Sequence, residues 1–181
     1  MPSQIAGQWN RAVPASIDDW RRSLVLVAIG AFALLLGVLL YLTDRPAAHA
    51  VLIPSVPALA SGGRLFGVIG QWMPTFVHTF AFSLFTAAAL PWCSTPRYGS
   101  CVAWCAVNVA FEIGQHRHIG PLLAEALTEH LGRSPLPRAL ANFFARGTFD
   151  SGDIAAAFVG AFAAAAVLYI VQPGRERPYA R

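Results

Sequence analysis

Charged side chains are scarce in this sequence, and lysine does not occur at all. Only 12% of the 181 residues are charged, whereas a soluble domain usually carries about a quarter. The 13 basic residues are all arginine, and the formal net charge is +4. Because nucleic acids are bound through concentrated positive charge, so small and dispersed a charge argues against a nucleic-acid partner.

Reactive-site motifs are also missing. The three cysteines lie in or beside apolar segments and form neither a disulfide framework nor a CxxC metal pattern, so we interpret them as small buried side chains. No G-x-S-x-G, P-loop, glycine-rich dinucleotide or HExxH motif is present. Glu112, His116 and His118 do not have the spacing of a helical zinc site. We therefore predict no metal and no cofactor.

Apolar residues dominate instead. They make up 56% of the chain, and the mean hydropathy is +0.52. Residues 23–42 are a run of 20 uncharged residues; as a helix the run would be about 30 Å long, the thickness of a bilayer's hydrocarbon core. A cleaved signal peptide does not fit, because its apolar region has only about 7–15 residues. We expect a membrane span.

Three further spans are predicted. Residues 65–96 contain no Asp, Glu, Lys or Arg, and a tryptophan at each end of residues 72–92 suits the membrane interfaces. The third span has to continue past Glu112, because only 14 residues run from Tyr98 to Phe111. The fourth is rich in alanine and ends at Pro173. The predicted spans are residues 23–42, 72–92, 98–117 and 154–171.

These spans predict an all-α integral membrane protein in which four transmembrane helices form a small bundle. The single membrane domain covers residues 23–171, with tails at 1–22 and 172–181. In the third loop, leucines and alanines of residues 122–131 repeat at helical spacing opposite the charged side chains. This pattern predicts a short amphipathic helix on the membrane surface, with a soluble helix packed on another loop as the alternative.

Arginine positions bear on orientation. With four crossings, both termini and the second connection share one side and carry seven arginines, against six on the other side. The Arg21–Arg22 pair beside the first span favours cytoplasmic termini. We expect a multi-pass protein of the bacterial cytoplasmic membrane. Its main partner is the lipid bilayer, and partner membrane proteins or a homo-oligomer are left open.

Alternating span directions bring polar side chains to a similar depth near one membrane face. The stripe formed by Asn108, Glu112 and Gln115 should face the bundle interior. An ionised carboxylate at a helix centre costs about 3 kcal/mol, so Glu112 needs a partner or a proton. The candidate polar pocket comprises His78, Asn108, Glu112, Gln115, Arg146, Asp150 and Asp153.

Most of these residues also have a structural interpretation. Asp150 followed by Asp153 resembles a capping box at the start of the fourth helix. His78 can be a helix–helix hydrogen-bond donor, and Arg146 can be an interfacial side chain. Glu112 is the hardest to explain structurally, since acids inside membranes are usually functional. Small residues that let a neighbouring helix approach closely are Ala156, Gly160 and Ala164.

Four sequence features follow one another along the chain: HTFAF at 78–82, FEIGQ at 111–115, RGTFDSGD at 146–153 and Gly160. As an ordered set they resemble the VanZ-like family of small bacterial membrane proteins. The resemblance covers residues 72–165. Where the family often has Asp-Lys before the histidine, this chain has Pro74-Thr75, and Ala157 stands in place of an asparagine, so the chain resembles a divergent member.

The resemblance implies a role in the cell envelope, since the family takes its name from a protein tied to teicoplanin resistance. It supplies no reaction. We expect an envelope membrane protein that is non-enzymatic or of unassigned activity. Its polar pocket at one membrane face would bind an amphiphilic or cationic ligand, such as a glycopeptide or an envelope lipid. Glu112 and Asp153 would supply negative charge, His78 and Gln115 hydrogen bonds, and Arg146 would orient the acids. The alternatives are an intramembrane enzyme that uses Glu112 and His78 as an acid/base pair on a lipid-linked substrate, and a small transporter or a subunit of a membrane complex.

Overall fold

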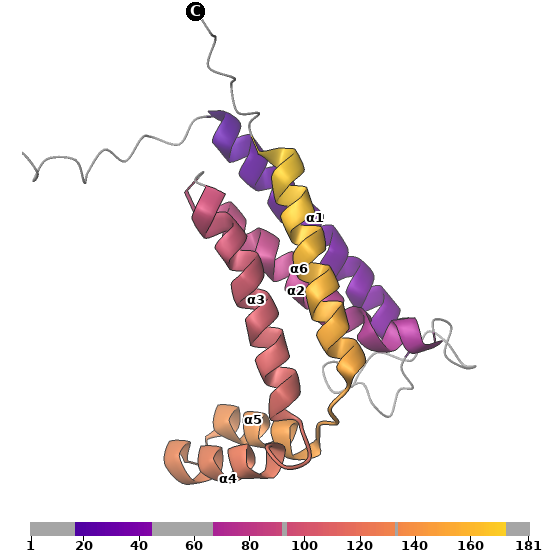
Figure 1. Cartoon of the computed structure of the whole chain (residues 1–181), viewed down its shortest axis with the longest axis vertical. Coiled ribbons are helices and arrows are strands. Elements are labelled where there is room, and N and C mark those ends of the chain that lie inside the picture. Colours follow the sequence, from indigo (N-terminus) through magenta and orange to yellow (C-terminus); the bar gives the residue numbers. More distant parts are fainter. Residues whose placement is uncertain (1–16, 45–66, 92–93, 133, 173–181) are drawn as a thin grey trace, which may run out of the picture.

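The structure is a computed structural model that describes residues 17–44, 67–91, 94–132 and 134–172. Within these residues the regular secondary structure is helical throughout, which confirms the all-α prediction for the described part of the chain. Four long helices and two short ones are present (Figure 1). The helices are α1 (Ile17–Asp44), α2 (Gly67–Ala89), α3 (Ser94–Gly114), α4 (Gly120–Leu131), α5 (Pro135–Arg146) and α6 (Ser151–Val171).

The four long helices lie side by side and alternate in direction (Figure 1). The start of α1 and the end of α6 therefore lie at one end of the bundle, here named the terminal end. At the opposite end, named the hairpin end, α4 and α5 pack against each other (Figure 1). Helix α2 is central, because it packs against α1, α3 and α6, whereas α1 makes only slight contact with α6.

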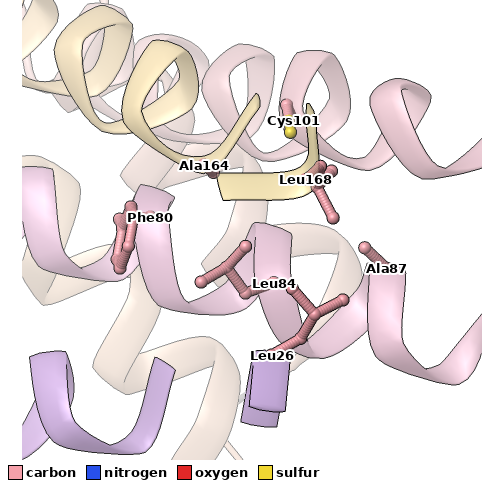
Figure 2. Packing of buried hydrophobic residues seen from close by; sticks show 7 residues of the cluster. All are labelled: Leu26, Phe80, Leu84, Ala87, Cys101, Ala164 and Leu168. Carbon is pink, nitrogen blue, oxygen red and sulfur yellow. The ribbon is translucent and has the colours of Figure 1, made fainter. Parts of the chain in front are cut away.

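Small residues allow these helices to approach closely. A Cβ atom added to Gly30 of α1 would lie 2.7 Å from the Phe85 ring of α2, and one added to Gly160 of α6 would lie 2.7 Å from the Phe76 carbonyl oxygen. Gly30 thus makes room for a ring, and Gly160 lets the backbones of α6 and α2 approach each other, as small residues do where helices pack closely. Figure 2 shows the buried cluster between the helices, which contains Leu26, Phe80, Leu84, Ala87, Cys101, Ala164 and Leu168.

The cysteines fit this packing where the structure describes them. Cys101 and Cys105 are buried and free, as the interpretation of small buried side chains requires. Cys93 lies outside the described residues.

Two of the described helices are long and apolar enough to cross a membrane. They are α1, over Ile17–Leu40, and α6, over Ser151–Val171. Both expose large apolar side chains on their outer faces: Leu35 is 69% exposed and Phe162 is 74% exposed. Apolar surface this extensive is unusual on a soluble monomer.

The bounds of the long helices differ from the predicted spans. Helix α2 begins at Gly67, and Pro74 is its eighth residue and not its start. Helix α3 begins at Ser94 and ends at Gly114, whereas residues 98–117 were predicted. Pro96 does not prevent the earlier start, because the first turn of a helix needs no backbone N–H donor. Helix α3 thus reaches 21 residues without continuing to Arg117, and Glu112 lies in its last turn.

The third loop contains two helices, where the sequence pattern predicts one. Helix α4 coincides with the predicted amphipathic segment. Helix α5 was not predicted, since Pro135 and Pro137 argue against a helix. Both prolines occupy its first turn, where proline is tolerated. The long polar connection is therefore a compact helical hairpin between α3 and α6.

Candidate functional site

Three carboxylates meet at the hairpin end. Glu112 comes from the last turn of α3, and Asp150 and Asp153 come from the start of α6. We name these three residues the acidic cluster. Glu112 is only 6% exposed. Its Oε1 atom accepts a short hydrogen bond from the Asp150 backbone N–H, across 38 positions of sequence. The three acids therefore lie at one end of the bundle, at the junction of α3 with the start of α6.

Asp150 joins the start of α6 to α2. It is the N-cap residue of α6, and its Oδ1 atom accepts a hydrogen bond of 2.8 Å from the Gly152 N–H. Its Oδ2 atom accepts a hydrogen bond of 3.0 Å from the indole Nε1 of Trp72. The Trp72 ring lies directly against Gly152, where an added Cβ atom would be 2.1 Å from it. Only glycine leaves room for the ring at this position.

Asp153 does not complete the predicted capping box. In that motif its carboxylate would accept from the Asp150 N–H, but Glu112 takes this donor. Asp153 instead accepts a hydrogen bond of 2.7 Å from the Thr75 hydroxyl, through its Oδ1 atom. Each aspartate therefore binds a different residue of α2, one helical turn apart, and Glu112 adds α3 to the same junction.

Gln115 borders the acidic cluster beside the hairpin. Its Nε2 atom lies 3.5 Å from Glu112 Oε2, which is long for a hydrogen bond. Its side chain also fills the space next to Gly147, where an added Cβ atom would lie 2.1 Å from Gln115 Oε1. Gln115 thus occupies the gap between α3 and the segment that leads into α6.

Aromatic side chains fix the hairpin to α3. The Phe111 ring lies 5.6 Å from Phe144 and 5.8 Å from Phe143, both on α5. His116 packs edge-on against Phe149 at 5.6 Å. The hairpin is therefore positioned by ring contacts beside the acidic cluster.

Three of the predicted pocket residues lie apart from the acidic cluster. His78 is exposed and stacks on Phe82, with ring centroids 5.8 Å apart. Asn108 donates to the Trp104 carbonyl oxygen of its own helix, at 2.9 Å. Arg146 is exposed and forms no hydrogen bond or ion pair with another described residue. No hydrogen bond joins His78 to Glu112, so the structure offers no direct acid/base pair between them.

The predicted packing stripe on α6 is shifted by one residue at its first position. Gly160 and Ala164 are buried, and Gly160 packs against the backbone of α2. Ala156 is partly exposed, while Ala157 is completely buried. The small buried face consists of Ala157, Gly160 and Ala164.

Sequence reasoning missed two members of the site. Trp72 was assigned to the membrane interface, and Thr75 was noted only as a departure from the family pattern. Their spacing in the sequence could have identified them, since Trp72, Thr75 and Thr79 lie on one face of a helix. The last of these is completely buried against α6.

A second polar region lies between α4 and α5. It is an open groove of about 710 Å³, lined by Ala124, Glu125, Thr128, Glu129, Ala141, Asn142 and Ala145. Among the described residues, no group of three or more His, Cys, Asp or Glu side chains could hold a metal ion, either in this groove or at the acidic cluster. The acidic cluster presents carboxylate oxygens that accept hydrogen bonds from a backbone N–H, an indole and a hydroxyl.

Comparison of the chain with models of known protein families, with curated proteins and with solved structures found no match in any of the three. The assignment of a function therefore rests on the residues and on their geometry.

Proposed function

We propose that this chain is a four-pass membrane protein of the bacterial envelope that binds the cationic group of an amphiphile at the acidic cluster. One observation carries the proposal. Glu112 and Asp150 come together at the hairpin end, and all the donors that contact them are neutral: two backbone N–H groups, an indole and, at 3.5 Å, an amide. No ion pair joins either carboxylate to a basic side chain of the described residues. The site thus retains negative charge beside a wide apolar surface.

Helix lengths and side-chain directions support four crossings. Helices α2 and α3 have 23 and 21 residues, which is enough for about 30 Å of hydrocarbon. Two hydroxyl side chains of α2 face inward: Thr79 and Ser83 are fully buried, and their hydroxyls bond backbone carbonyl oxygens of α2 at 2.9 and 2.6 Å. Such hydroxyls do not face lipid, although they lower the average hydropathy of the helix.

The arginine positions support cytoplasmic termini. The terminal side carries seven arginines against six on the hairpin side, and the Arg21–Arg22 pair directly precedes the apolar part of α1. Arginines close to a span are usually cytoplasmic, whereas acids contribute little to orientation. In this orientation the acidic cluster faces the outer side, where an envelope-active amphiphile arrives.

The contacts at the hairpin end are consistent with the VanZ-like resemblance. Two of the motifs that carry it, residues 111–115 and 146–153, are separate in sequence but meet through the bond between Glu112 and the Asp150 N–H. Gln115 of the first motif also packs on Gly147 of the second. Arg146 does not take part, so we assign it no role in ligand binding.

Teicoplanin, an amphiphilic glycopeptide, is the probe that the resemblance selects. We would express the wild type, Glu112→Gln and Asp150→Asn at equal membrane levels in a susceptible bacterium, and measure teicoplanin susceptibility. Binding to the purified protein in lipid nanodiscs would be measured in parallel. Both substitutions should weaken binding at least about tenfold, since each removes one charge from the site. The matched control is Glu129→Gln, the same change on the exposed face of α4. Unchanged binding and susceptibility in both cluster variants would refute the proposal.

A further inference from the structure

The large apolar side chains of α5 gather on one side of the helix. Leu136, Leu140 and Phe143 follow one another at intervals of four and three residues, which places them on the same side of a helix. Leu136 is 70% exposed, and Phe143 is also exposed. We name these three residues the apolar face of α5.

The other sides of α5 are occupied by the protein itself. The Phe144 ring fills the space beside Gly114, where an added Cβ atom would lie 2.6 Å from it. Ala141 and Ala145 line the groove that α5 forms with α4, and Ala141 is buried. The apolar face of α5 therefore lies on the side away from α4.

This face meets the outer surface of α3. Phe111 and Val107, one helical turn apart on α3, are both exposed. The rings of Phe111 and Phe143 lie 5.8 Å apart, so the two exposed apolar surfaces join at this contact. A medium that covers the outer surface of α3 therefore also reaches the apolar face of α5, and under the proposed function that medium is lipid.

The direction of the hairpin agrees with this continuity. In Figure 1, α4 and α5 run across the direction of α3 at the hairpin end, and α5 lies nearer to the long helices than α4 does. Because the long helices cross the bilayer in the proposed arrangement, the hairpin then lies along the bilayer surface, with α5 on the membrane side.

The two helices of the hairpin carry opposite charges. Helix α5 contains Arg138 and Arg146 and no acidic residue, whereas α4 contains Glu125 and Glu129 and no arginine. None of these four side chains is in an ion pair with another described residue. The phosphates of anionic lipids attract the first helix and repel the second. Charge therefore favours the same orientation as the apolar face does.

We propose that α5 is an interfacial helix, whose apolar face enters the boundary between headgroups and acyl chains and whose two arginines bind the phosphates of anionic phospholipids, while α4 faces water. This inference rests on the proposed membrane location. It moves the lipid contact from residues 122–131, where the sequence pattern predicts it, to α5. The exposed Leu122 and Leu131 of α4 are nine residues apart and so lie on opposite sides of that helix.

Photo-cross-linking of the full-length protein tests the position of α5. The vesicles contain equal amounts of phosphatidylethanolamine and phosphatidylglycerol. A photoreactive phenylalanine is encoded in place of Leu136 or Phe143 on α5, Thr128 on α4 or Phe162 on α6, all of which are exposed. After illumination, mass spectrometry of the intact protein measures the fraction that has gained the mass of one phospholipid. Positions 136, 143 and 162 should give this adduct, and position 128 should give at least about fivefold less.

The identity of the bound lipid tests the arginines. With the photoreactive residue at position 143, the phosphatidylglycerol adduct should exceed the phosphatidylethanolamine adduct about threefold or more. Replacing both arginines of α5, Arg138→Gln with Arg146→Gln, should bring this ratio close to one. The matched control neutralises the two charges of α4, Glu125→Gln with Glu129→Gln, and should not lower the ratio. A ratio that starts at one, or that the arginine changes leave unaltered, would overturn the phosphate contact.

Position 162 separates failure of this inference from failure of the membrane location. An adduct at 162 with none at 136 and 143, or equal adducts at 128 and 136, would overturn the interfacial α5 and leave the membrane location standing. If position 162 also gave no adduct, the membrane location itself would be refuted, and the interfacial helix with it. Loss of ligand binding at the acidic cluster, by contrast, would leave all these adducts unchanged.

Discussion

The two ends of the bundle differ in the charged side chain that is buried there. A buried arginine lies at the C-terminal end of α2, and a buried glutamate lies at the N-terminal end of α6. At the terminal end Arg97, which is 1% exposed, donates from Nε to the Pro91 carbonyl at 3.0 Å and from Nη2 to the Leu90 carbonyl at 2.7 Å. At the hairpin end Glu112 accepts from the backbone N–H at the start of α6. Each charge matches the helix dipole that it meets, since cations favour C-termini and anions favour N-termini.

The two ends differ in the reach of these contacts. Arg97 bonds carbonyls six and seven residues away, so it stabilises one tight connection between α2 and α3. The Glu112 contact spans 38 residues and requires the whole hairpin to be in place. Local contacts hold Arg97, although at the same end Ser23 of α1 also donates to the Ala88 carbonyl of α2, at 3.1 Å. At the hairpin end, long-range contacts gather three carboxylates from α3 and α6, and the proposed binding site depends on that gathering.

The largest effect is expected from Arg97→Met. The substitution leaves two carbonyl oxygens at the end of α2 without their donors, and each such loss costs about 1–3 kcal/mol. We expect the free energy of unfolding in detergent to fall by about 3 kcal/mol, measured by thermal or denaturant unfolding. Arg97→Lys keeps the charge but not the planar pair of donors, so it should lose less. An unchanged stability in Arg97→Met would show that this end does not depend on the guanidinium.

The next largest effect is expected from Gly152→Ala. The new methyl group would meet the Trp72 ring and displace it, which would also break the bond from Trp72 to Asp150. Overpacking of this kind costs about 1–3 kcal/mol. The matched control is Gly99→Ala on α3, where an added Cβ atom has nothing within 4 Å; it should stabilise the helix by about 0.5–1 kcal/mol. Equal stability changes in both variants would contradict the described contact.

A pair of substitutions at Glu112 separates structure from charge at the hairpin end. Glu112→Leu leaves the Asp150 N–H without an acceptor, so the free energy of unfolding should fall by about 2 kcal/mol. Glu112→Gln keeps an acceptor oxygen and should lose less than about 1 kcal/mol. Unfolding of both variants in detergent checks this order. If the glutamine variant were as unstable as the leucine variant, the carboxylate charge itself would be required for folding.

The smallest effect is expected from Thr75→Val. It removes the hydroxyl that donates to Asp153, a contact that is only partly buried. We expect a loss of about 1 kcal/mol, measured as a shift in the unfolding midpoint. Thr148→Val, at an exposed position, is the control and should be neutral. If Thr75→Val lowered the free energy of unfolding as much as Gly152→Ala, the bond from Thr75 to Asp153 would stabilise the junction at least as much as the bond from Trp72 to Asp150.

Hydrophobic runs were sufficient to predict the long helices, but not their ends. The first apolar run, for example, extends into a helix that begins at Ile17, where Asp18 and Asp19 favour the helix N-terminus. Ends depend on such capping residues and on prolines in first turns, as at Pro96 and Pro135, and these signals are weaker than the apolar pattern.

The meeting of Glu112, Asp150 and Asp153 was predictable, because alternating directions bring these residues to one end. Their partners were not. Whether His78 or Thr79 faces α6 depends on how α2 is rotated about its own axis. A single sequence predicts that rotation only to within about one residue. One step of 100° moves a side chain from a helix interface to the exposed side of the helix, which is the difference between buried Thr79 and exposed His78.

The bond between Glu112 and the Asp150 N–H has a consequence for how the chain is made. Synthesis runs from the N-terminus, so α3 is made before α6 exists. During that interval Glu112, Trp72 and Thr75 lack the partners that α6 later supplies. A chain truncated after α5 should therefore expose these polar groups and be degraded faster than the full chain, which makes synthesis of α6 the step that satisfies this junction.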